Sequence, residues 1–145
     1  MATLCLPLEA SAAENTNVSV SPPAETVDAG QQFTVTIDVA PGAAMAGMQF
    51  DLSFDTSVVV VDRVEEGNLL RQGGATTFFN TGKIDNQAGT ITGVFGAIIS
   101  PGETVSSEGA FAIITLTAKA QGDSWPLALS NVIVGDSDGN ALPVT

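Results

Sequence analysis

The chain has 145 residues, enough for one domain and short for two, and 44 % of them are hydrophobic. Its formal net charge of −12 disfavours binding to nucleic acid or to an acidic membrane surface, because both would repel it. The sequence has no histidine and one cysteine, Cys5, which excludes Ser-His-Asp and Cys-His catalysis, the usual zinc ligand sets and an internal disulfide.

Residues 1–17 are not expected to belong to the fold. A short apolar stretch, Thr3–Leu8, precedes Ala10–Ala12, whose small side chains resemble a signal-peptidase site. The apolar part is short and lacks a basic start, so we interpret this segment as a flexible tail or the remnant of a secretory leader. A cloning tail or a linker is the alternative. Cys5 is then a bystander thiol on this tail.

Short strands separated by turn residues follow in chain order. Residues 18–23 predict a first strand ended by two prolines, and residues 32–39 alternate strictly between apolar and polar side chains. In residues 45–55 apolar side chains point one way and small or polar ones the other, which predicts a central strand with one buried face. The Val58–Val61 run fits a short strand buried on both sides.

The second half of the chain continues the same pattern. Residues 76–80 and 82–85 predict an irregular strand pair or one bulged strand. Further strands are expected at residues 90–99, 110–118, 127–134 and 142–144. About eight or nine strands with glycine, proline and asparagine turns predict an all-β protein, either a two-sheet β-sandwich or a jelly roll.

Two of these strands lack a polar face. In residues 91–97 and 111–115 both faces are apolar, although each sheet of a sandwich should present one polar face to solvent. We interpret the two strands as neighbours that share an exposed apolar surface for a partner protein. Coverage of this surface by loops or by the N-terminal tail is the alternative.

The segment Asp136–Asn140 resembles the start of a calcium loop. Asp136, Asp138 and Asn140 place oxygen atoms at alternate positions around a glycine. The carboxylate that should close such a loop is missing, because apolar residues follow. A polar hairpin turn is therefore favoured, and these three residues stay weak candidates for a metal site.

A carboxylate pair for glycoside hydrolysis is the catalytic alternative. Its candidates are Asp51, Asp55, Glu65 and Glu66. Asp55 stands at a strand end, where aspartate commonly caps a turn, and the two glutamates are adjacent loop residues. The sequence also has no tyrosine to form an aromatic platform, so catalysis is disfavoured.

The order and spacing of the segments resemble a cohesin domain, the module that binds dockerins in cellulosomes and in related non-cellulosomal proteins. The resemblance covers residues 18–145. It rests on Ala29-Gly30 leading into FTVTIDV, on AGMQFDLSFD before a valine-rich strand, and on GTITGVFGA, EGAFAIITLTAKA and LSNVIVGDSDGNALPV. It implies a flattened two-sheet β-sandwich with jelly-roll topology and about nine strands.

The resemblance also implies a binding face. A small calcium-loaded helical dockerin would lie on a sheet formed by residues 46–54, 76–85, 90–98 and 110–119. Together with the hydrophobic pattern, this predicts an apolar centre and a polar rim formed by Gly47, Gln49, Asp51, Ile84, Ile91, Gly93, Phe95, Ala97 and Asn131. Many cellulosomal cohesins carry asparagine and aspartate in place of Gly47 and Gln49, and Asp51 is our candidate to replace those lost acceptors.

The sequence therefore predicts a non-catalytic, secreted or cell-surface adaptor that binds a dockerin and so assembles extracellular complexes. We expect no cofactor on this chain, because calcium would belong to the dockerin. A carbohydrate-binding module and a structural or adhesion spacer are the alternatives, although Trp125 is the one tryptophan available to a sugar platform. A homodimer through the same face is a further hypothesis, and neither nucleic acid nor membrane is an expected partner.

Overall fold

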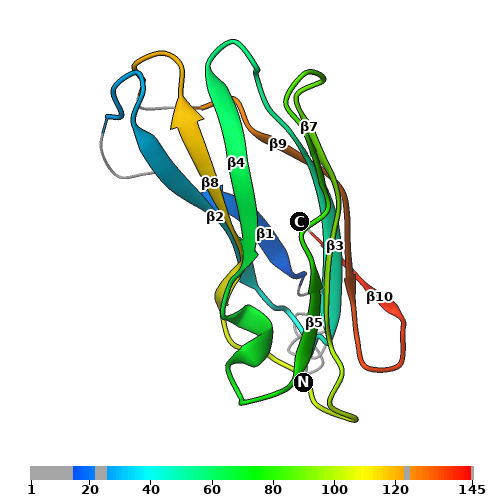
Figure 1. Ribbon diagram of the computed structural model, residues 1–145. Coiled ribbons are helices and arrows are strands. Elements are labelled where there is room, and N and C mark those ends of the chain that lie inside the picture. The colour runs from blue at the N-terminus through cyan, green and yellow to red at the C-terminus, as the bar shows by residue number, and fades with distance from the viewer. Residues whose placement is uncertain (1–14, 22–25, 123–124, 145) are drawn as a thin grey trace, which may run out of the picture.

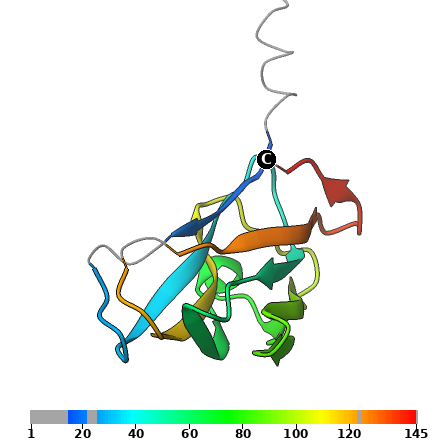
Figure 2. The ribbon, with the colours of Figure 1, turned by 90° about the horizontal axis from the view of Figure 1, so that it is seen from above.

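Two antiparallel sheets face each other in the described part of the chain (Figures 1 and 2). The computed structural model describes residues 15–21, 26–122 and 125–144. The predicted tail with Cys5 and Ala10–Ala12 lies outside these residues, as do both prolines at positions 22 and 23. The predicted all-β sandwich is confirmed.

The strands divide into a four-stranded and a six-stranded sheet. The first has the order β1 (Asn17–Ser21), β2 (Gln32–Ala40), β8 (Gly109–Ala118), β4 (Val59–Glu66). The second has the order β10 (Ala141–Leu142), β9 (Ala128–Gly135), β3 (Gly47–Ser53), β7 (Thr90–Ile98), β5 (Thr77–Asn80), and β6 (Lys83–Asp85) also pairs with β7. A short 3₁₀ helix, η1 (Leu69–Arg71), follows β4. Among the described residues no helix is long and apolar enough to cross a membrane.

A cluster of aromatic rings joins the two sheets. Phe50 of β3 meets Phe111 of β8 edge to face at 6.0 Å between ring centroids, and Phe79 of β5 meets Phe111 at 5.6 Å. Gly96 leaves room for this cluster, since a Cβ there would lie 2.8 Å from the Phe111 ring. The apolar side of residues 45–55 is buried as predicted.

The strand expected at residues 110–119 belongs to the opposite sheet from the one predicted. β8 lies between β2 and β4 and is not a neighbour of β7. It is apolar on both sides because Ile114 and Leu116 face the core, and a bulge opposite Ile37–Asp38 adds Phe111 to the buried side chains. Strand order depends on pairing between distant residues, which a local hydrophobic pattern does not encode.

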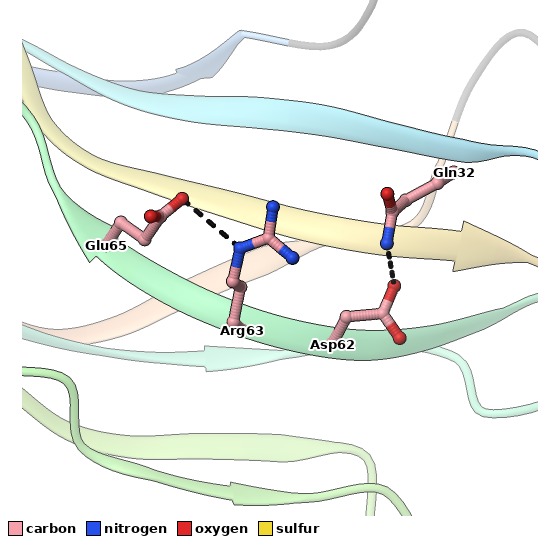
Figure 3. Close-up of polar contacts among 4 residues, drawn as sticks. All are labelled: Gln32, Asp62, Arg63 and Glu65. Carbon is pink, nitrogen blue, oxygen red and sulfur yellow. Dashed lines mark hydrogen bonds and ion pairs between the residues drawn. The ribbon is translucent and has the colours of Figure 1, made fainter.

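The outer face of the four-stranded sheet is polar (Figure 3). Asp62 accepts hydrogen bonds from Gln32 Nε2 at 3.2 Å and from Thr117 Oγ1 at 2.6 Å. Arg63 and Glu65 form an ion pair at 3.3 Å. The prediction of an exposed apolar surface at residues 111–115 is therefore wrong, since polar side chains cover this side of the sandwich.

The fold begins before residue 18. Thr16 is buried, its N–H donates to the carbonyl of Pro143 at 2.9 Å, and its hydroxyl accepts from the N–H of Gly42 at 3.1 Å. It also forms a parallel bridge with Val144. Residues 15–17 therefore pack with the domain, beside its last described residues (Figure 2).

Three turn aspartates accept hydrogen bonds from residues that follow them in the chain. These bonds lower each pKa below its ordinary value of 3.8. The main donors are the Ser57 hydroxyl for Asp55, the Ala88 N–H for Asp85 and the Asn140 N–H for Asp136. The ionised carboxylates therefore stabilise the turns that connect the strands.

Acid should weaken the fold through these turns. Because folding lowers the three pKa values, their stabilisation is complete above the ordinary pKa and is lost as pH falls through the folded values. We expect a thermal midpoint that is nearly constant above about pH 5 and falls below about pH 4. Circular dichroism melts across this range measure it.

A variant with Asp55→Asn, Asp85→Asn and Asp136→Asn keeps an acceptor oxygen in each turn but cannot titrate there. It should show a smaller acid-dependent loss than the natural chain. An identical acid dependence in both proteins would contradict the role given to these carboxylates.

The Phe50→Ala variant tests the aromatic cluster. Removing this fully buried ring should lower the free energy of unfolding by about 3–5 kcal/mol, since a cavity remains between the sheets. Urea denaturation measures the change. Phe78→Ala is the matched control, because this ring is exposed and should cost less than about 1 kcal/mol. Equal losses in the two variants would refute the assigned core.

Candidate functional site

Large apolar side chains are exposed on the outer face of the six-stranded sheet. Phe78, Phe95 and Ile133 are 51 %, 40 % and 49 % exposed, and Ile99, just beyond β7, is 58 % exposed. The rings of Phe78 and Phe95 lie 6.2 Å apart between centroids. We call these four residues, together with Gln49 on the interior strand β3, the apolar face. Exposed apolar clusters of this kind usually mark protein-binding surfaces.

Cross-strand pairing arranges this surface in two rows. The first row crosses β5, β7, β3 and β9 as Asn80, Phe95, Gln49 and Ile133. The second row crosses the same strands as Phe78, Ala97, Gly47 and Gly135. Paired positions share one side of a sheet. The first row therefore presents the large apolar side chains of Phe95 and Ile133 on either side of Gln49. The second row presents the Phe78 ring next to three small residues.

A groove of about 410 Å³ lies over the small residues of the second row. The loop at residues 99–103 and the hairpin at residues 135–139 complete its lining, together with Phe95 and Ile133. Gly47 has no space for a side chain, because a Cβ there would lie 2.8 Å from the carbonyl oxygen of Gly96. An asparagine at this position would therefore require a shift of the sheet.

Ile91 and Ile84 do not lie on the outer face, contrary to the prediction. Ile91 is 0 % exposed, and Ile84, its cross-strand partner, packs against the core. A bulge in β7 is the reason, since Phe50 pairs with Val94 whereas Leu52 pairs with Ile91. The extra residue reverses the alternation, so Ile91 points inward and Phe95 outward.

The other predicted residues lie together on the outer side of the sheet. They are Gly47, Gln49, Asp51, Gly93, Phe95, Ala97 and Asn131. The Asp51 carboxylate connects the two neighbouring strands, because Oδ1 accepts from the Gly93 N–H at 2.8 Å and Oδ2 accepts from Asn131 Nδ2 at 2.7 Å. Contact of these residues with a partner stays a prediction.

Phe78, Ile99 and Ile133 were missed by the sequence reasoning. Phe78 precedes a second phenylalanine, and Ile133 stands between two valines, so their surroundings show no polar alternation. Ile99 follows the last residue of its strand. For Ile99 and Ile133 the bulges in β7 and β9 were the available signal, since a bulge changes which residues face outward.

The groove is acidic where it is charged. Among the described residues that line it, the two charged ones, Glu103 and Asp136, are both acidic. The whole chain carries a net charge of −12. These charges favour a partner with basic groups around its apolar contact residues.

The hairpin at Asp136, Asp138 and Asn140 is a polar turn. Asp136 Oδ1 accepts the N–H groups of both other residues at 2.9 Å. In the described ranges, no three acidic, histidine or cysteine side chains form a group that could hold a metal ion. The geometry therefore agrees with the turn favoured from the sequence.

The carboxylates considered for catalysis do not converge. Asp51 lies on the outer side of the six-stranded sheet, whereas Glu65 lies on the outer side of the four-stranded sheet, next to Arg63. Asp55 caps its own turn through Ser57. The core separates the two outer surfaces, so Asp51 and Glu65 cannot act on one bond.

Trp125 does not form a flat exposed platform. Its ring stacks on Phe33 at 4.8 Å between centroids and is half-buried. Sugar-binding platforms need a broad aromatic face in solvent, so the position of Trp125 gives no support to carbohydrate binding.

Comparison with known proteins agrees with this architecture. The family model described as "Cohesin domain" matches residues 18–144. A non-cellulosomal cohesin from the hyperthermophilic archaeon Archaeoglobus fulgidus is similar in structure, with a TM-score of 0.65, 17 % identity, and coverage of 91 % of this chain and 86 % of that chain. No curated protein sequence matches.

Two clostridial structures are similar as well. One is a type I cohesin–dockerin complex from Clostridium thermocellum, with a TM-score of 0.69, 13 % identity, and coverage of 91 % of this chain and 95 % of that chain. The other is the cohesin module of a family 33 glycoside hydrolase from Clostridium perfringens, with a TM-score of 0.68, 15 % identity, and 90 % coverage of both chains. At these identities the likeness shows the fold. The match over residues 18–144 shows the family: this chain belongs to the cohesin family, whose domains are non-catalytic binding modules.

Proposed function

We propose that this cohesin binds a dockerin module through the apolar face of its six-stranded sheet. The observation that carries the proposal is the row of Phe95, Gln49 and Ile133 across three strands, in which two large apolar side chains stand in solvent. Solved relatives in this fold include complexes of a cohesin with a dockerin. Exposed aromatic and aliphatic side chains on a rigid sheet suit such a partner.

The proposed interface has an apolar centre and a polar margin. Phe95, Phe78 and Ile133 would anchor the partner, and the groove beside them would accept one of its side chains. Gln49, between the two anchors, would supply a hydrogen bond that selects the partner. Gly47, Gly93 and Ala97 have little or no side chain, so they would let the partner approach the sheet closely.

The proposed partner carries basic side chains and its own calcium. Glu103 and Asp136 line the groove, and the chain has only four basic residues in all. A partner with positive charge near its apolar contact would associate faster and bind more selectively. A secreted or cell-surface setting fits a module of this family, and it is part of the same proposal.

The Phe95→Ala variant tests the binding face. It should weaken binding of a calcium-loaded dockerin by about 1–3 kcal/mol, because an anchor at the centre of the contact is lost. Isothermal titration calorimetry against a panel of dockerins measures this change. The free energy of unfolding should change by less than about 1 kcal/mol, since the ring is exposed.

Thr34→Ala is the matched control for that measurement. Thr34 is exposed on β2, in the opposite sheet, and should leave the affinity unchanged. Unchanged binding by the Phe95 variant, or an equal loss in the Thr34 variant, would show that the face is misassigned. Retention of the natural chain on cellulose or chitin, without binding to any dockerin, would favour the carbohydrate-binding alternative.

Chelation should abolish the complex while leaving this chain intact. EDTA would remove calcium from the dockerin, whose fold depends on it in our proposal. The thermal midpoint of this chain alone should stay the same, because its described residues hold no metal-binding group. A complex that survives EDTA, or a midpoint that falls with it, would contradict the assignment of calcium to the partner.

A further inference from the structure

Asp51 lies opposite one bulge and next to a second. In β7, Phe50 pairs with Val94 and Leu52 with Ile91, so two residues face Asp51. In β9, Gln49 pairs with Ile133 and Asp51 with Ser130, so the two residues between these pairs, Asn131 and Val132, face Phe50 and the bulge adjoins the Asp51 pair. A bulge on each side of one interior strand makes this position unlike its neighbours in the sheet.

Each bulge contains a residue with left-handed backbone geometry. Gly93 in β7 has a φ of 75°, and Asn131 in β9 has a φ of 52°. Asn131 is the one residue other than glycine with a positive φ in the described part of the chain. Asparagine tolerates this region better than most residues, but the surrounding contacts must still favour it.

The Asp51 side chain contacts both of these residues. Its Oδ1 accepts the backbone N–H of Gly93 at 2.8 Å, and its Oδ2 accepts from Asn131 Nδ2 at 2.7 Å. Both bonds involve a carboxylate, and bonds of that type are stronger than those between neutral groups. One side chain thus joins β7 and β9 across β3 on the outer side of the sheet.

The two bulges decide which side chains face the partner. Each adds one residue and so reverses the alternation of its strand. After the β7 bulge Phe95 points outward, and after the β9 bulge Ile133 points outward. Continued in register without the bulges, both side chains would fall on the core side. The two anchors that flank Gln49 therefore depend on the same pair of irregularities.

We infer that Asp51 is a positioning residue, which holds both bulges in place and thereby presents Phe95 and Ile133 as a preorganised pair. The effect on binding rests on the proposed function, whereas the effect on the sheet does not. Each carboxylate oxygen already accepts one bond from this chain, and these bonds fix the side chain between the two bulges. We therefore assign Asp51 an effect on binding through the anchors, and the affinity measurement below distinguishes it from a direct bond to the partner.

Three variants separate these roles. Asp51→Ala removes both hydrogen bonds. Asp51→Asn keeps an oxygen for the Gly93 N–H but places an NH₂ group against the NH₂ group of Asn131. The double variant Asp51→Asn with Asn131→Asp exchanges donor and acceptor, so it restores both bonds. Asp62→Ala is the matched control, because Asp62 also accepts two bonds across strands, on the opposite face of the sandwich.

The first readout is hydrogen exchange of the Gly93 amide in the free protein, measured by NMR. Asp51→Ala should speed exchange by about tenfold or more, as expected for loss of a bond to a charged group. The exchanged pair should return it to near the natural rate, and Asp62→Ala should leave it unchanged. If the Gly93 amide of Asp51→Ala exchanges at the same rate as in the natural chain, the inference is overturned, whatever the result with any dockerin.

The second readout is affinity for the dockerin that binds the natural chain most tightly. Asp51→Ala should weaken binding by about tenfold, and the exchanged pair should recover it. If the double variant restores the exchange rate of the Gly93 amide but not the affinity, Asp51 contacts the partner directly and the inference is wrong. If Gly93 responds as expected but the natural chain binds no dockerin, the inference stands and the proposed function fails.

Discussion

The side-chain alternation of β3 is the constraint on which the rest of the structure depends. Its inward residues Met48, Phe50 and Leu52 are buried against the opposite sheet, so Gln49 and Asp51 must face outward. β3 is also an interior strand, between β7 and β9. The outward residues of this one strand therefore lie at the centre of the exposed surface, and a slip of one residue would exchange core and surface.

A sheet face suits recognition of a partner better than it suits catalysis. Paired strands hold Phe95 and Ile133 at fixed spacing, so little conformational entropy is lost when a partner covers them. Acidic groups are spread over both outer surfaces and around the turns, and the core separates Asp51 from Glu65, two of the carboxylates considered for a catalytic pair. The molecule is thus a rigid support for one apolar surface, which is the property a binding module requires.

The sequence predicted the sandwich and the buried side of residues 45–55, because regular alternation follows from strand geometry alone. It failed where a bulge interrupts the alternation. Ile91 and Phe95 are four residues apart and were expected on one face, but the bulge at Gly93 separates them. A glycine inside a strand was the available signal. The sheet to which β8 belongs could not be read from local pattern, since its neighbours β2 and β4 lie far away in the chain.

The most direct test of the binding face is an NMR footprint of the natural chain with a saturating calcium-loaded dockerin. Amide and side-chain signals of Phe78, Phe95 and Ile133 should shift or broaden, along with the groove lined by residues 99–103 and 135–139. Signals on the outer side of β2, β4 and β8 should stay where they are. A footprint centred on Thr34 and Asp62, or spread evenly over both sheets, would contradict the account.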